Sequence, residues 1–197
     1  MPSDPDAVAA KSELRLRLLT RRTERTDADR TVAAEALTRA LLEGLAGART
    51  VAAFVPDPTE PGSGWLPEAY TRLGARILLP VVPDVGRELR WAEHTGPLAP
   101  GRFGLLEPEG PRLEPDAIGE ADAVVVPALA VARDGVRLGR GGGYYDRALP
   151  LARADAVLVS LVFDDELVET LPAEPHDRLV TAVVTPSDGW QALPASR

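Results

Sequence analysis

The sequence contains no cysteine and no long apolar segment. Without cysteine the chain has neither a disulfide framework nor a thiol nucleophile. A helix that spans a bilayer needs roughly 18 or more consecutive apolar residues, and no run in the sequence approaches that length. The first 22 residues place acidic side chains ahead of the first base and include no continuous apolar stretch, so they do not match a secretory signal. We therefore expect a cytoplasmic protein with no membrane partner.

Basic charge is also scarce, with a formal net charge of −8 and a pI of about 4.9. Proteins that bind nucleic acid usually present a basic face and a high pI, so we expect no nucleic-acid partner. The two histidines, His94 and His176, do not have the spacing of metal ligands, and no Ser/His/Asp set is visible. The length of 197 residues is that of one domain.

Lysine is nearly absent, because 21 of the 22 basic residues are arginine and Lys11 is the exception. Asparagine is missing as well, and isoleucine occurs only as Ile77 and Ile118. This composition indicates a coding bias that replaces lysine by arginine wherever the chemistry permits. Lys11 then marks either a position where a guanidinium group will not serve or a chance survival, and composition leaves both readings open.

Helical spacing of apolar residues predicts helices over residues 6–22 and 27–47, the second with Asp27 as its N-cap. Beyond them the pattern changes to short, continuous apolar runs, interrupted by one helical segment at 65–74. These runs predict strands at 50–56, 75–82, 121–131, 156–163 and 178–186.

Continuous apolar strands are typical of a sheet that is covered on both faces. We therefore predict an α/β fold, in which residues 1–197 form a single three-layer domain with a twisted, mainly parallel sheet flanked by helices. The segment 83–120 is rich in proline, glycine and acidic residues and has little periodicity. It is predicted to be an irregular arm with one strand at 88–94.

A glycine run stands out in the stretch RLGRGGGYYDR, residues 137–147, which follows an apolar strand and begins a helical pattern at Tyr144. A glycine-rich turn between a strand and a helix allows several backbone N–H groups to point at one anion. Arg137 and Arg140 add guanidinium groups suited to phosphate or carboxylate. The stretch therefore predicts a phosphate-binding loop, although a tight turn with solvated arginines would have the same composition.

Asp146 lies where it would repel a bound phosphate unless a cation stood between them, and Mg²⁺ held by carboxylate and phosphate oxygens meets that need. The loop is not a Walker A loop, because Tyr144 and Tyr145 stand where Lys-Ser/Thr would follow the last glycine. It is not the dinucleotide pattern either, because the third residue after Gly141 is Tyr144.

The longer stretch VPALAVARDGVRLGRGGGYYDRAL closely resembles the signature of the 5-formyltetrahydrofolate cyclo-ligase family, also called methenyltetrahydrofolate synthetases. The resemblance continues in KSELR near the start, AAFVPDPTEPGS, GRFGLLEP and PHDRLVTAVVTP. It implies an enzyme that closes 5-formyltetrahydrofolate to 5,10-methenyltetrahydrofolate with ATP and Mg²⁺, releasing ADP and phosphate through a phosphorylated formyl (iminophosphate) intermediate. It implies small-molecule substrates only.

The resemblance also implies roles for individual residues. It gives catalytic roles to Lys11 and Arg140 and a metal-binding role to Asp146 and Asp177. The ATP-binding set is Lys11, Arg15, Arg137, Leu138, Gly139, Arg140, Gly141, Gly142, Gly143, Tyr144 and Tyr145. The folate-binding set is Val55, Glu60, Phe103, Arg140, Gly141, Gly142, Gly143 and Tyr144, with Glu60 facing the amino-pyrimidine edge of the pterin and Phe103 able to stack on a ring.

The chain departs from the family pattern at a few positions. Gly142 stands where many members have lysine, Thr181 replaces a frequent aspartate, and Pro150 is expected to stop or kink the helix that begins at Tyr144. Two other functions stay open: a relative that binds ATP but has lost folate closure, and a sugar-phosphate isomerase-like enzyme. The presence of Glu60 argues against the first function. The basic pair of Lys11 and Arg15, one helical turn apart, argues against the second function.

Overall fold

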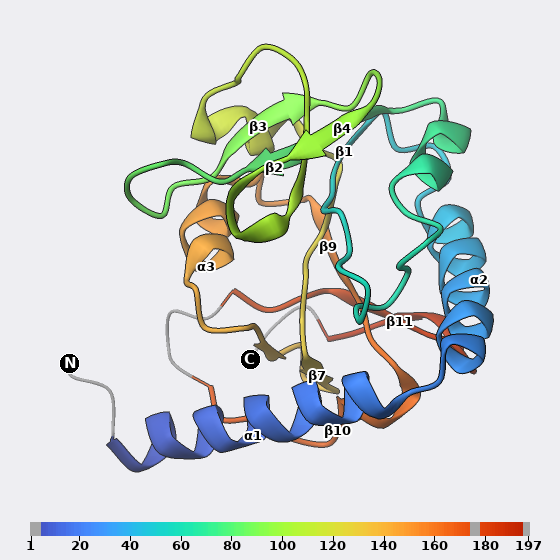
Figure 1. Ribbon diagram of the computed structural model, residues 1–197, viewed down its shortest axis with the longest axis vertical. Helices are drawn as coiled ribbons and strands as arrows, with labels where there is room; N and C mark the ends of the chain where they lie inside the picture. The colour runs from blue at the N-terminus through green and yellow to red at the C-terminus, as the bar shows by residue number, and fades with distance from the viewer. Residues whose placement is uncertain (1–4, 174–177, 195–197) are drawn as a thin grey trace.

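A seven-stranded sheet forms the centre of the computed structural model, which describes residues 5–173 and 178–194 (Figure 1). The strand order is β12-β11-β9-β6-β1-β2-β3. The five inner strands run parallel to one another, and the two edge strands β3 and β12 are antiparallel to their neighbours. The strands are β1 (Thr50–Ala52), β2 (Arg76–Val81), β3 (Arg90–Glu93), β6 (Ala123–Val125), β9 (Val157–Leu161), β11 (Ala182–Thr185) and β12 (Gly189–Ala192).

Both faces of this sheet are covered, as its apolar strands require. The helix α2 (Asp27–Gly44) and the 3₁₀ helix η1 (Glu68–Leu73) pack on one face. The 3₁₀ helices η3 (Pro115–Glu120) and η4 (Leu149–Leu151), with the short helix α3 (Tyr144–Ala148), pack on the other. The prediction of a three-layer α/β fold with a mainly parallel sheet is therefore confirmed.

The helix α1 (Pro5–Glu24) covers a second, smaller sheet instead of the central one (Figure 1). That sheet has the order β10-β7-β8, with β7 (Ala130–Ala132) between β10 (Leu167–Val168) and β8 (Arg137–Leu138). Leu18 of α1 packs against its apolar face. Within the described residues, no helix is long and apolar enough to span a membrane.

A buried ion pair fixes α1 to the rest of the molecule. The Arg22 guanidinium donates from Nε and Nη2 to the two carboxylate oxygens of Glu166, at 2.7 and 2.8 Å, and from Nη2 to the carbonyl of Ala128. Both charged side chains are almost fully enclosed. Glu166 ends the 3₁₀ helix η5 (Asp164–Glu166) and also accepts from the backbone N–H of Phe163. The pair therefore joins α1 to two segments that follow strands of the central sheet.

Several sequence-based boundaries were wrong. The N-cap of α2 is Thr26, not Asp27, because the Thr26 hydroxyl accepts from the N–H of Asp29. The predicted strand 121–131 is two strands, β6 and β7, in different sheets, and Pro127 lies in the break between them. The helical segment predicted at 65–74 is the 3₁₀ helix η1.

The arm at 83–120 also holds more structure than one strand. Besides β3 it contains the hairpin of β4 (Leu98–Pro100) and β5 (Leu106–Pro108), connected by η2 (Arg102–Gly104). The prediction for Pro150 is confirmed, since α3 ends at Ala148 and a 3₁₀ turn follows. Thr181 has a structural role in place of the frequent aspartate: its hydroxyl accepts from the N–H of Leu158 at 3.0 Å.

Candidate functional site

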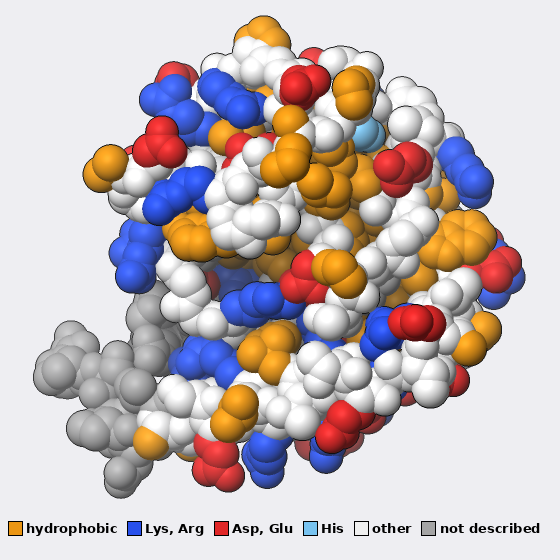
Figure 2. All heavy atoms as spheres, viewed as in Figure 1, with side chains coloured by type: hydrophobic (Ala, Val, Ile, Leu, Met, Phe, Trp, Pro, Cys, Tyr) orange, Lys and Arg blue, Asp and Glu red, His pale blue; other side chains and the backbone are white. Residues whose placement is uncertain are grey.

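A cavity of about 870 Å³ opens beyond the carboxyl ends of three parallel strands. Phe54 and Asp57 follow β1, Val82 follows β2, and Pro127 follows β6. This edge is where ligands usually bind in open α/β sheets, because loops leave the strands there in different directions. Figure 2 shows a hollow in this face, with Lys and Arg side chains gathered along one side of it.

The glycine loop forms one wall of the cavity. It runs from β8 to α3, and Gly141 and Gly143 have φ values of +90° and +72°, which favour glycine because it has no Cβ. The loop is held from the side of α1, where Arg15 Nε donates to the carbonyl of Gly139 at 2.9 Å. Lys11, one turn earlier on α1, is half-buried and lines the same cavity. The structure therefore brings the two basic residues of α1 and the loop together.

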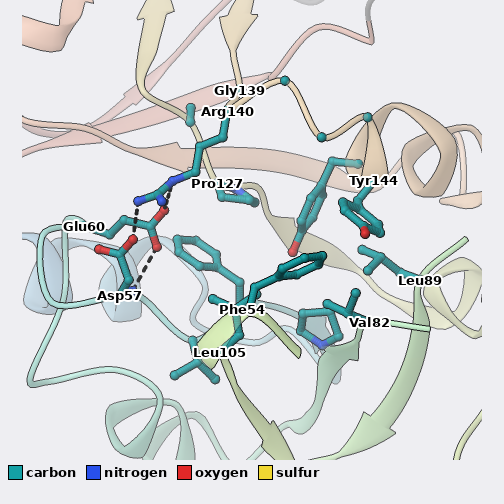
Figure 3. Close-up of a pocket in the computed structure, with 18 of the residues that line it drawn as sticks. Phe54, Asp57, Glu60, Val82, Leu89, Leu105, Pro127, Gly139, Arg140 and Tyr144 are labelled. Atoms are coloured by element: carbon teal, nitrogen blue, oxygen red, sulfur yellow. Dashed lines mark hydrogen bonds and ion pairs between the residues drawn. The ribbon is translucent and has the colours of Figure 1, made fainter. Parts of the chain in front are cut away.

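Two carboxylates and an arginine occupy one end of the cavity (Figure 3). Arg140 forms ion pairs with Asp57 and, through Nε at 3.2 Å, with Glu60. The loop after β1 folds so that the other Glu60 oxygen accepts from the N–H of Asp57 at 3.0 Å, and Asp57 accepts from Thr59. The side chain of Glu60 is only 10% exposed, whereas that of Arg140 is 46% exposed.

The environment shifts the two carboxyl pKa values in opposite directions. Burial, followed by the charge of Asp57, raises the pKa of Glu60, although Arg140 and Arg22 act in the other direction. Burial alone would also raise the pKa of Asp57, but hydrogen bonds from Thr59 and the charge of Arg140 outweigh it and lower that pKa. Asp57 is thus the stronger acid of the pair, and Glu60 is the weaker one.

The middle of the cavity is apolar. Phe54 and Pro127 lie between the carboxylate end and an opposite end where Tyr144 and Leu89 stand (Figure 3). The hydroxyl of Tyr145, which also lines the cavity, is enclosed and has no hydrogen-bond partner among the described residues. Burial and then the charge of Glu60 raise the pKa of Tyr145, so this hydroxyl keeps its proton and is a donor.

Phe103, in the arm at 83–120, forms the outer rim of the cavity and is 71% exposed. The centre of its ring lies 5.0 Å from the guanidinium carbon of Arg102. Phe103 has a φ of +58°, which is unusual for a residue with a side chain. In this conformation Phe103 lines the cavity.

The cavity contains every candidate residue of the sequence analysis that the structure describes, and Asp177 lies outside the described residues. The lining also includes residues that the sequence analysis missed, among them Phe54, Asp57, Leu89 and Pro127. Asp57 carried a usable signal, since it stands three residues before Glu60 in a proline-flanked loop that follows a strand. Leu89 and Pro127 carried none, because nothing local marks them as cavity residues.

Of the two predicted metal-binding residues, Asp146 is the one that the structure describes, and it lines this cavity. One of its oxygens accepts from Arg137 Nη2 at 2.7 Å, and its side chain is 46% exposed. No group of three or more His, Cys, Asp or Glu side chains able to hold an ion exists within residues 5–173 and 178–194. A single carboxylate is nevertheless a sufficient protein contribution for Mg²⁺ when phosphate oxygens and waters complete the shell. The donor set therefore suits an ion that arrives with a phosphate chain.

Comparisons with known proteins agree with this geometry. A family model described as the 5-formyltetrahydrofolate cyclo-ligase family matches residues 7–186. The 5-formyltetrahydrofolate cyclo-ligase of Mycolicibacterium smegmatis is 48% identical over 190 residues, which cover 93% of this chain and 97% of that protein. The protein of the same name from Escherichia coli (strain K12) is 34% identical over 148 residues, 73% of this chain and 81% of its own. An NMR structure of 5,10-methenyltetrahydrofolate synthetase from Aquifex aeolicus superposes with a TM-score of 0.73 at 28% identity, covering 95% of this chain and 94% of that one.

Proposed function

The chain belongs to the 5-formyltetrahydrofolate cyclo-ligase family, and on that premise we propose that it closes 5-formyltetrahydrofolate to 5,10-methenyltetrahydrofolate at the expense of ATP. One observation supports this proposal above the others. A single cavity joins a phosphate-type wall, made by the glycine loop with Lys11 and Arg15, to an apolar pocket that ends in the Glu60 carboxylate. A nucleotide and a pterin can therefore meet in one enclosed space.

The folate would enter with its amino-pyrimidine edge toward Glu60. An ionised carboxylate accepts two parallel N–H bonds from such an edge, while the ring system lies against the apolar wall that includes Phe54 and Val55. Glu60 must then exchange its ion pair with Arg140 for the ligand. Arg140 keeps Asp57 as a partner, so it stays at the cavity while its guanidinium becomes available to a phosphate.

The phosphate chain of ATP would lie between the glycine loop and α1. Backbone N–H groups of the loop and the cationic groups of Lys11, Arg15 and Arg140 can neutralise its charge. Phosphoryl transfer asks little covalent chemistry of a protein, so positioning and charge neutralisation by these groups are sufficient.

The reaction then follows from the chemistry of the substrates. The formyl oxygen attacks the γ-phosphorus, the bond to ADP breaks, and the formyl carbon becomes electrophilic as an iminophosphate. N10 attacks this carbon, phosphate leaves with the former formyl oxygen, and N10 loses its proton, which leaves the methenyl bridge between N5 and N10.

Mg²⁺ would be held by Asp146, and by Asp177 outside the described residues. When bound, the ion supplies positive charge to the phosphate oxygens. One oxygen of Asp146 is paired with Arg137, and its other oxygen would be offered to the ion.

The test is the absorbance rise of the methenyl product when the protein is mixed with 5-formyltetrahydrofolate, ATP and Mg²⁺. We expect product to form at a rate that disappears when ATP is omitted or a chelator is in excess. Equal rates without ATP would refute the proposal. Binding of ATP without product at any folate concentration would instead support a relative that has lost folate closure.

A further inference from the structure

Two arginines outside the catalytic and phosphate-binding sets meet at the end of the glycine loop. A Cβ placed on Gly143 would lie 2.8 Å from Nη1 of Arg147 and 3.7 Å from Nη1 of Arg87. Arg147 belongs to α3, and Arg87 to the loop between β2 and β3, which projects over α3 in Figure 1. Residues from two distant parts of the sequence thus place their cationic groups at one point, against a backbone that only glycine leaves open.

Neither arginine is neutralised by a carboxylate in the described part of the chain. Arg147 Nη1 donates to the carbonyl of Gly143 at 2.9 Å. This hydrogen bond holds the Arg147 side chain in place but does not neutralise its charge. The nearest acid on α3, Asp146, is already paired with Arg137. Two guanidinium groups brought together in this way repel each other unless an anion binds between them. Their arrangement therefore favours an anionic ligand.

The position of Arg87 and Arg147 relative to the cavity indicates which anion binds between them. Glu60 lies at one end, and Tyr144 and Leu89 lie at the other (Figure 3). Neither arginine lines the cavity itself, but Gly143, against which both lie, does line it, next to Tyr144, so the pair lies beside the end opposite Glu60. Arg15 contacts the loop from the side of α1, next to Gly139 and Gly141 rather than Gly143.

A reduced folate has the same order of chemical groups. Its amino-pyrimidine edge is at one end, an aromatic p-aminobenzoyl spacer is in the middle, and a glutamyl group with two carboxylates is at the other end. We propose that Arg87 and Arg147 bind the glutamyl carboxylates of the folate substrate. This inference rests on the proposed function, since it takes the folate to be oriented with its pterin at Glu60.

Such a clamp is a site of binding and substrate selection, not of chemistry. Both arginines are exposed, so each carboxylate contact is partly screened by water and salt. We expect Arg87→Gln and Arg147→Gln each to raise the KM for 5-formyltetrahydrofolate about three- to tenfold, with kcat and the KM for ATP unchanged. Raising the salt concentration should raise this KM in the wild type and have a smaller effect in the double variant.

The decisive comparison uses a substrate without the charges. With 5-formyltetrahydrofolate whose two glutamyl carboxylates are converted to amides, the wild type and both variants should have the same KM. Arg90→Gln is the matched control, because Arg90 is an exposed arginine three residues from Arg87 that pairs with Glu114 instead. It should leave the KM of both substrates unchanged.

Three outcomes would overturn the clamp. In the first, the variants raise the KM for the diamide as much as the KM for the natural substrate. In the second, they raise the KM for ATP instead, which would assign the two arginines to a nucleotide phosphate. In the third, they leave every KM unchanged. In each of these cases the wild type still turns over 5-formyltetrahydrofolate, whereas a wild type with no turnover would refute the proposed function itself.

Discussion

At the scale of single residues, Lys11 gives the most specific prediction. In a chain that otherwise uses arginine, its lone lysine is half-buried at the cavity, one turn from Arg15. Arginine is longer and forked, so Lys11→Arg keeps the charge but displaces it. We expect a loss of kcat of up to about a hundredfold, the cost of misplacing a catalytic group by about 1 Å, with little change in melting temperature.

The exposed Arg17, on the same helix, supplies the control for Lys11. Arg17→Lys exchanges the same two residue types away from the cavity and should leave both kcat and melting temperature unchanged. A Lys11→Arg variant with wild-type turnover would show that the lone lysine is an accident of coding, and steady-state kinetics of the two variants decide between these readings.

Glu60 predicts a pH dependence with a definite sign. Its carboxylate must be ionised to accept the N–H groups of a pterin, and burial with the charge of Asp57 raises its pKa. The KM for 5-formyltetrahydrofolate should therefore rise as the pH falls, with a midpoint above the usual value for glutamate of about 4.3. The KM for ATP should not show a transition at this midpoint. Glu60→Gln should abolish the transition in the KM for 5-formyltetrahydrofolate. A midpoint at or below the usual value would show that Glu60 does not determine folate binding.

Asp146 predicts a dependence on Mg²⁺. Asp146→Asn weakens one oxygen ligand without changing the size of the side chain, so the Mg²⁺ concentration for half-maximal rate should rise about tenfold, and excess Mg²⁺ should restore part of the rate. Asp155→Asn, which removes an exposed carboxylate paired with Arg153, is the control and should behave as the wild type. Identical Mg²⁺ titrations for the wild type and Asp146→Asn would place the ion elsewhere.

The residues of the site could be predicted from the sequence where they stand in one contiguous motif. Arg137 to Asp146 are adjacent in the chain, so their grouping needs no knowledge of the fold. Asp57 and Arg147 were missed although both have a local signal, since Asp57 stands three residues before Glu60 and Arg147 ends the stretch 137–147. Arg87 was missed because its proximity to the glycine loop depends on where the loop after β2 leaves the sheet, and such a contact leaves no local pattern.

At the scale of elements, the buried pair of Arg22 and Glu166 makes a prediction about α1. Removing either partner leaves the other charge buried and unpaired, which costs about 3–5 kcal/mol of unfolding free energy. Arg22→Met and Glu166→Met should each be destabilising by this amount in urea denaturation, and the double variant should lose much less than the sum. Additive losses would mean that the two charges do not act as a pair.

Elements with a strong periodic pattern were the ones that could be predicted. The helix α1 appears close to its expected place because its apolar residues recur at helical spacing, and the strands β2 and β9 do so because continuous apolar runs determine them. The strands β8 and β10 have two residues each, too few for any period, and they exist because β7 lies between them. The division of 121–131 at Pro127 is a tertiary effect, since the chain leaves one sheet to enter another there.

At the scale of the whole molecule, the sheet determines that the residues proposed to bind the two ligands line one cavity. Three loops after β1, β2 and β6, the glycine loop and α1 all contribute to one cavity because the parallel strands end at the same edge. This arrangement allows direct transfer of a phosphoryl group from nucleotide to folate, which is the central claim of the account. Figure 3 shows the carboxylates of Asp57 and Glu60 beside Arg140 of the glycine loop.

The most direct test of that claim follows an oxygen atom. If the formyl oxygen attacks the γ-phosphorus, then 5-formyltetrahydrofolate labelled with ¹⁸O in its formyl group must pass the label to the released phosphate. Mass spectrometry after a single turnover with unlabelled ATP and water should find one labelled oxygen in each phosphate formed. Unlabelled phosphate, released together with the methenyl product, would contradict the account, because ATP would then be hydrolysed by water without activating the formyl group.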